Sequence, residues 1–200
     1  MPWAPDYLTL AEAKVYLRIT DTVDDVELSA AIPAVSRMID TACMRQFGVL
    51  AAPAARTYRR TPVLSYETGL WEREIDDLMT TVGLLVDGVA YASSGATLLP
   101  DNAALDGKPW TRIGVTTAPT GSYPGAPVTS VLTGTWGWSA VPAVVPMAAK
   151  LQLNRMGFRR DAPQGVAGSP DQGSEIRMLA KLDPDAVKLL GAVRRRRQPV

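Results

Sequence analysis

The sequence predicts an α+β protein: an N-terminal αα-hairpin and C-terminal helices form a helical bundle, with a small antiparallel β-domain inserted between them. Apolar residues recur at helical spacing over residues 1–50, which predicts the hairpin. The period changes over residues 51–139, where turn residues separate short alternating runs typical of strands. Helical spacing returns over residues 140–193, and residues 194–200 form a basic tail.

Two helix-start signals lie near the N-terminus. Thr9-Leu-Ala-Glu12 reads as a capping box, which predicts a helix from about Leu10 to Arg18. Asp24 is the expected cap of a second, longer helix, which we expect to end at Gly48. Pro33 lies inside that second pattern and removes a backbone donor, so we expect a kink there.

The middle of the chain contains one strong hairpin signal. Asp87-Gly88 stands between apolar flanks and supplies the two positive-φ residues of a type I′ turn. Other strands are expected over Arg56–Thr61, Trp110–Thr116 and Val128–Trp138. Together they predict the inserted β-domain.

The last third of the chain returns to helix. Pro142 and Pro146 fit the first turn of a helix, where a missing N–H costs little. That helix closes near Arg159 and Arg160, and a Gly/Pro-rich loop follows. Asp183-Pro184 then predicts a final helix, with Asp as the N-cap and Pro at the first position.

Composition excludes several kinds of chemistry. The chain has no histidine, so Ser-His-Asp and Cys-His catalysis and the commonest zinc sites are excluded. Its only cysteine, Cys43, lies in a helical apolar pattern and is predicted to be a buried structural thiol. No apolar run is long enough to cross a bilayer, and no secretory signal is evident. We expect no enzyme activity, no cofactor and no metal.

Charge is distributed unevenly along the chain. Residues 1–50 hold four basic and seven acidic side chains (net −3), whereas residues 151–200 hold ten basic and five acidic (net +5). This asymmetry suits a protein whose two ends meet different partners. Arg194, Arg195, Arg196 and Arg197 form the densest cluster. Three interpretations stay open for it: docking on an acidic partner, contact with nucleic acid, or a solvated tail.

Two other clusters are assigned to structure rather than chemistry. Trp136 and Trp138 are two apart on a strand, with no interleaved cation, which favours packing in a core or subunit interface over a base-stacking platform. Phe158 is likewise predicted to pack in a core or subunit interface. The carboxylates of residues 72–77 lack the spacing of a calcium loop and are expected to be solvated. Those carboxylates are Glu72, Glu74, Asp76 and Asp77.

Three stretches carry a resemblance to a known family. They are Tyr7–Gly48, with Leu-Thr-Leu-Ala-Glu-Ala-Lys-Val-Tyr-Leu-Arg-Ile before an acidic break; Val128–Pro163, ending Arg-Arg-Asp-Ala-Pro; and Asp183-Pro-Asp-Ala-Val-Lys-Leu-Leu before the arginines. In order and spacing they resemble the gp6-like head-tail connector (adaptor) proteins of tailed bacteriophages, particularly those of actinobacterial-host siphophages. Pro33 and the long β-rich middle depart from the smaller, all-helical members.

The resemblance implies a structural virion protein of the neck, at the head-tail interface, assembled in the host cytoplasm. It would be one subunit of a ring, commonly of twelve copies, that docks under the portal protein, meets a stopper or other neck protein, and surrounds passing genomic DNA without binding it specifically. No membrane partner is implied. Arg194–Arg197 would anchor this chain on the portal protein. Charge at the interfaces of the ring would come from Asp24, Asp25, Arg159 and Arg160. The alternative is a nucleic-acid-binding module that uses the arginine cluster.

Overall fold

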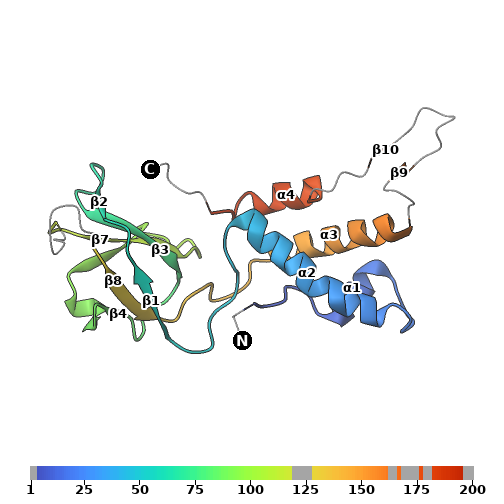
Figure 1. The fold of residues 1–200 in the computed structure, drawn as a ribbon, viewed down its shortest axis with the longest axis horizontal. Coiled ribbons are helices and arrows are strands. Elements are labelled where there is room, and N and C mark those ends of the chain that lie inside the picture. Colours follow the sequence, from blue (N-terminus) through green and yellow to red (C-terminus); the bar gives the residue numbers. More distant parts are fainter. Residues whose placement is uncertain (1–3, 119–127, 162–165, 168–175, 178–181, 196–200) are drawn as a thin grey trace. The chain divides into compact units, whose positions relative to one another are not determined.

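A computed structural model describes residues 4–118, 128–161, 166–167, 176–177 and 182–195. The fold is α+β, as predicted. The chain divides into two compact units: Met1–Gln46 together with Val141–Val200 form a helical unit, and Phe47–Ala140 form a β unit (Figure 1). Each unit has a hydrophobic core of its own.

The helical unit combines both ends of the chain. Its helices are α1 (Leu10–Leu17), α2 (Asp25–Cys43), α3 (Val144–Asp161) and α4 (Pro184–Leu190), and α3 contacts each of the other three. Buried residues recur every three or four positions along α2, which therefore presents one apolar face to the bundle. The residues at the centre of this core are Leu28, Ile32, Val35, Ile39, Val145, Ala148, Ala149 and Leu153.

Helix starts follow the predicted signals. The Thr9 hydroxyl accepts from the amide of Glu12, whose carboxylate accepts from the amide of Thr9, which confirms the capping box of α1. Asp183 caps α4, with Pro184 at the first position as predicted. Pro146 lies in the first turn of α3, where no intrahelical bond requires its amide.

The prediction that the second helix ends at Gly48 was wrong. Helix α2 ends at Cys43, because Met44 takes a left-handed conformation (φ 55°) and the amides of Met44 and Arg45 bond back to the carbonyls of Thr41 and Asp40. A non-glycine residue rarely ends a helix in this way, and the sequence offered no signal for it. The helix runs on through Pro33, whose ring is exposed, although the carbonyl of Ser29 has no amide at that position to accept from.

The β unit contains two four-stranded antiparallel sheets, with strand orders β1-β8-β4-β5 and β2-β3-β7-β6. An isolated antiparallel bridge between Leu78 and Trp136 links them. One core of buried residues serves both sheets. The strands are β1 (Ala54–Tyr58), β2 (Val63–Leu64), β3 (Trp71–Leu78), β4 (Leu85–Val86), β5 (Val89–Ala90), β6 (Ala96–Leu99), β7 (Trp110–Val115) and β8 (Ser130–Gly134). The core residues are Ile75, Leu78, Leu84, Leu98, Ile113, Leu132 and Trp136.

The predicted hairpin is present between β4 and β5. Asp87 (φ 50°) and Gly88 (φ 82°) both have positive φ, as a type I′ turn requires. The Asp87 carboxylate also accepts from the amide of Val131 at 2.6 Å, which fixes the turn against β8. The turn residues therefore set both the hairpin and its place in the sheet.

The prediction that the carboxylates of residues 72–77 are solvated was wrong for two of them. They belong to β3, where Glu72 is 7% exposed and Asp77 is 6% exposed. Glu72 pairs with Arg112 at 2.5 Å and accepts from the hydroxyl of Thr68, and Asp77 accepts from the indole N–H of Trp138 at 2.9 Å. Buried carboxylates persist when they are paired in this way.

Part of the predicted Gly/Pro-rich loop lies outside the described residues. Within it the structure describes only a two-residue antiparallel pair, β9 (Val166–Ala167) with β10 (Ile176–Arg177).

Candidate interaction surface

The described residues hold no group of three or more Cys, Asp and Glu side chains placed to bind a metal ion. Among those same residues, none of the helices is both long and apolar enough to cross a membrane. A pocket and the root of the basic tail both lie in the helical unit.

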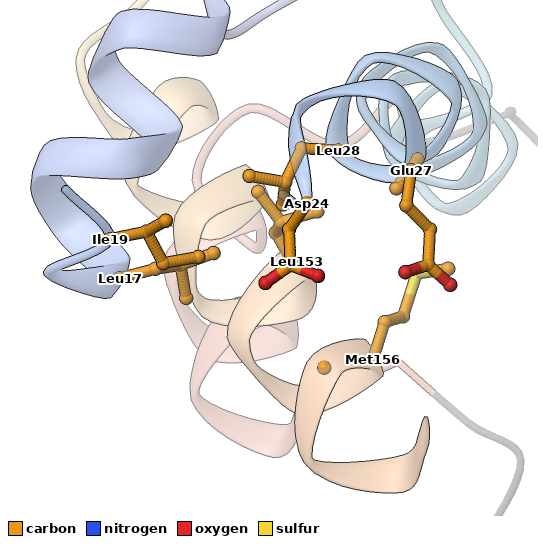
Figure 2. Close-up of a pocket in the computed structure, with 9 residues that line it drawn as sticks. Leu17, Ile19, Asp24, Glu27, Leu28, Leu153 and Met156 are labelled. Carbon is orange, nitrogen blue, oxygen red and sulfur yellow. The ribbon is translucent and has the colours of Figure 1, made fainter. Parts of the chain in front are cut away.

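An apolar pocket opens where the end of α1, the start of α2 and the end of α3 meet (Figure 2). Its volume is about 240 Å³, which is below the range of sites for drug-sized ligands. The pocket is lined mainly by aliphatic and methionine side chains, with two carboxylates. The lining residues are Leu17, Ile19, Asp24, Glu27, Leu28, Ala31, Leu153, Met156 and Gly157.

Acidic groups mark this end of the helical unit. Residues 14–27 hold four carboxylates and two cations, a net charge of −2. Lys14 binds the carboxylate of Asp25 at 2.6 Å and the carbonyl of Asp21, so this cation is engaged within the turn. Asp24 is the N-cap residue of α2 by position, but its side chain makes no cap hydrogen bond and lies instead at the pocket (Figure 2).

Large apolar side chains are also exposed at this end. Val15, Val23 and Val26 are 80%, 83% and 85% exposed. These three valines are close in sequence to the pocket residues Leu17, Asp24 and Glu27, and each is exposed on the surface of the helical unit.

The basic tail begins at the opposite end of α2. After α4, the amides of Val193 and Arg194 bond to the carbonyl of Leu190, and the amide of Arg195 bonds to the carbonyl of Cys43 at 2.9 Å. The root of the tail is therefore joined to the last residue of α2. The side chain of Arg194 is exposed and that of Arg195 is half-buried. Arg196 and Arg197 lie outside the described residues.

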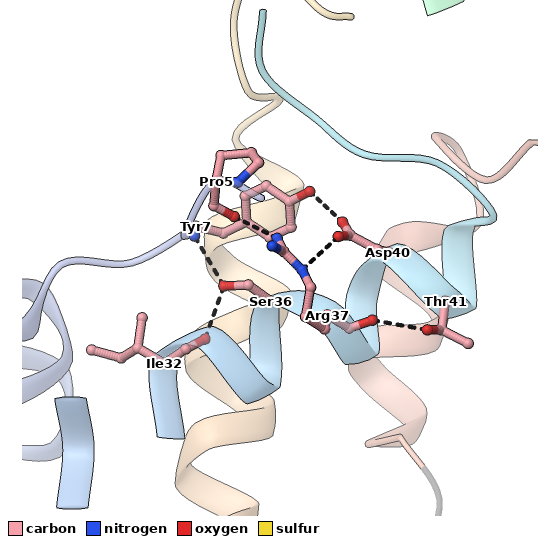
Figure 3. Close-up of polar contacts among 7 residues, drawn as sticks. All are labelled: Pro5, Tyr7, Ile32, Ser36, Arg37, Asp40 and Thr41. Atoms are coloured by element: carbon pink, nitrogen blue, oxygen red, sulfur yellow. Dashed lines mark hydrogen bonds and ion pairs between the residues drawn. The ribbon is translucent and has the colours of Figure 1, made fainter. Parts of the chain in front are cut away.

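A polar cluster fixes the N-terminal segment to the C-terminal half of α2 (Figure 3). The hydroxyl of Tyr7 donates to the carboxylate of Asp40, which also pairs with Arg37 at 2.8 Å. The guanidinium of Arg37 donates to the carbonyl of Pro5, and the Ser36 hydroxyl accepts from the amide of Tyr7. Burial raises the pKa of Asp40, while the hydrogen bond from Tyr7 and the charge of Arg37 oppose that rise. The cluster holds the segment that leads into α1.

Trp136 and Trp138 of the β unit are not available for stacking on nucleic acid. Trp136 is fully buried and its indole N–H donates to the carbonyl of Ala54 at 2.7 Å. The guanidinium of Arg56 lies 5.0 Å from the centre of its ring. Trp138 is 4% exposed and packs against Phe47 with ring centres 5.3 Å apart. Both tryptophans belong to the interior of the β unit.

The other predicted site residues fall in different places. The side chains of Phe158, Arg159 and Arg160 lie outside the described residues, although their backbone continues α3. The structure thus brings Asp24 to a pocket and ties Asp25 to Lys14. The interface and docking roles of these residues stay predictions.

Sequence reasoning missed the pocket itself. Its walls come from three segments that are far apart in the chain, and each wall residue fits an ordinary amphipathic helix. The one signal in the sequence was that valines and carboxylates alternate around the predicted break between the first two helices, over residues 21–27.

No known protein family matches the sequence, and no curated protein matches it. A solved structure described as the neck of an empty GTA particle computed with C6 symmetry contains a similar chain. That chain is 18% identical to this one, and the alignment covers 92% of this chain and 97% of the other, with a TM-score of 0.46.

Proposed function

We propose that the protein is a structural subunit of the neck of a tailed-phage particle, a head-to-tail adaptor that assembles as a ring, commonly of twelve copies, around a DNA channel. The proposal starts from the three stretches that resemble phage connectors. In this proposal the protein carries out no chemical reaction and uses no cofactor.

The observation that carries the proposal is the polarity of the helical unit. The apolar pocket, with the carboxylates of Asp24 and Glu27 in its lining, lies at the N-terminal end of α2. The root of the arginine tail is bonded to the C-terminal end of the same helix. A closed ring is built from heterologous contacts, so each subunit needs two different, complementary faces. This chain meets that requirement, because the apolar pocket with its two carboxylates lies at one end of α2 and a cationic segment starts at the other.

The arginine tail has two competing partners in a ring beneath a portal: the portal protein and the next copy of the chain.

Genome passage requires that DNA does not adhere to the channel, so we expect a neutral or acidic lumen. An arginine-rich lumen wall in the assembled ring would contradict this part of the proposal.

The experiment is mass photometry of the purified full chain, alone and mixed with its cognate portal protein, with a variant that ends at Val193 as the comparison. We expect a large assembly in the presence of portal. Absence of any assembly with portal, over the range of concentrations the chain tolerates, would overturn the proposal.

The nucleic-acid module is the second candidate, and the arginine cluster is the observation that favours it. Because Trp136 and Trp138 are buried, such binding would rest on phosphate contacts of the arginines rather than on stacking by these two rings. It predicts DNA affinity that falls steeply between 50 and 200 mM salt. The same purified chain, titrated with a DNA duplex at both salt concentrations, separates this candidate from the adaptor.

A further inference from the structure

We infer that the apolar pocket at the start of α2 receives the arginine tail of a second copy of this chain. The inference rests on the proposed ring and names the contact that joins neighbouring subunits. The pocket side is formed by Leu17, Ile19, Leu28 and Met156 with the carboxylates of Asp24 and Glu27 at its edge. The tail side is residues 194–200.

The tail and the pocket are chemically complementary. Four consecutive arginines are followed closely by Pro199 and Val200, so the segment carries cations beside small apolar groups. The pocket presents the matching combination, since carboxylates border a cavity lined largely by aliphatic side chains (Figure 2). The arginine side chains would pair with the rim, and the apolar residues would enter a volume of about 240 Å³.

The distance that the arginines can span indicates which copy supplies the tail. Helix α2 rises about 1.5 Å per residue, so Glu27 lies about 24 Å along the helix from Cys43. The amide of Arg195 is bonded to the Cys43 carbonyl. From there Arg197 can move away by about 7 Å of backbone, and its extended side chain adds on the order of 7 Å. The arginines of one chain therefore fall short of the acidic rim on the same chain.

Because the arginines of one chain cannot reach the carboxylates at the rim of its own pocket, a tail that pairs with this rim comes from a neighbour, and this contact is heterologous. The same contact repeated from copy to copy gives a closed ring if the rotation closes. Val15, Val23 and Val26, which are close in sequence to the pocket residues, are exposed and offer further apolar surface to such a neighbour. The portal protein is the competing acceptor of the tail.

The test is a mixed disulfide between two differently substituted full chains. One chain carries Glu27→Cys and the other carries Arg197→Cys; Glu27 is exposed on α2. Cys43 is fully buried, and burial raises the pKa of its thiol to about 11, so it stays unreactive in the folded chain. The matched control replaces Glu27→Cys by Glu67→Cys, an exposed carboxylate in the β unit.

We expect the Glu27→Cys and Arg197→Cys chains to form a mixed dimer at least about tenfold faster than the control pair, with a rate that falls at high salt. Adding Asp24→Lys to the Glu27→Cys chain should lower that rate, and adding Arg196→Glu to its partner should restore it. Equal rates for the pocket and control pairs, with or without portal protein, would overturn the inference. If the chain still assembles on the portal while the rates are equal, the tail docks elsewhere and the proposed function stands; if no assembly forms either, both fail.

Discussion

Removal of the Asp183 side chain should loosen α4 and, with it, the root of the arginine tail. Helix α4 has only seven residues, so its start signal matters more than it would in a long helix. One Asp183 carboxylate oxygen accepts from the amides of Asp185 at 2.9 Å and Ala186 at 3.3 Å. The other oxygen lies 3.4 Å from the guanidinium of Arg155 on α3.

The expected loss in the free energy of unfolding follows from these two roles of Asp183. Loss of an N-cap side chain costs about 1 kcal/mol. The ion pair is partly screened, because its side chains are 18% and 21% exposed, and it adds roughly 0.5 kcal/mol. Asp183→Ala should therefore lower the free energy of unfolding by about 1–2 kcal/mol. Asp183→Asn keeps the cap acceptor and loses the charge, so it should cost only about 0.5 kcal/mol.

The assay is urea unfolding followed by the helical circular dichroism signal, with amide hydrogen exchange of Arg194 and Arg195 as a local readout. With a typical urea dependence, the Ala variant should unfold at a midpoint lower by roughly 0.5–1 M, and the two amides should exchange faster. Equal stabilities of the Ala and Asn variants would refute the capping argument. Unchanged exchange at Arg194 and Arg195 would refute the link between α4 and the tail.

Three further predictions concern other parts of the molecule. Cys43 should not react with a thiol reagent at pH 8 in the native chain and should react fully in urea, because burial raises its pKa to about 11; rapid native reaction would contradict its burial. Burial raises the pKa of Asp40 in the folded state, so the fold binds that proton more tightly than the unfolded chain does, and the contribution of Asp40 to stability should fall as pH rises from about 4. In urea titrations at a series of pH values, Asp40→Asn should remove this fall in the free energy of unfolding. If the free energy of unfolding depends on pH equally in the original chain and the variant, the raised pKa of Asp40 is disproved. Gly88→Ala should lower stability by about 1–2 kcal/mol, because Gly88 has φ 82° in the type I′ turn; in thermal melts, an unchanged midpoint would contradict the turn assignment.

Local signals predicted the parts of the fold that depend on a few neighbouring residues. The capping box at Thr9, the Asp183-Pro184 start and the Asp87-Gly88 turn are each complete within four residues, so the sequence alone identifies them. The burial of Cys43 followed equally from helical spacing.

Features that depend on distant partners were not predictable in the same way. Strand β3 contains four carboxylates, and two of them are buried because Arg112 and Trp138, far along the chain, bind them. The end of α2 at Cys43 depends on a left-handed Met44, a conformation that this residue type rarely adopts. The pocket forms only when α1, α2 and α3 meet, so its site was invisible in any single segment.

The proposed ring in the neck of a phage particle can be seen by electron microscopy of the full chain bound to its cognate portal protein, with class averages viewed along the axis. We expect a closed ring of this chain coaxial with the portal. Single copies scattered on the portal, or no bound chain at all, would contradict it.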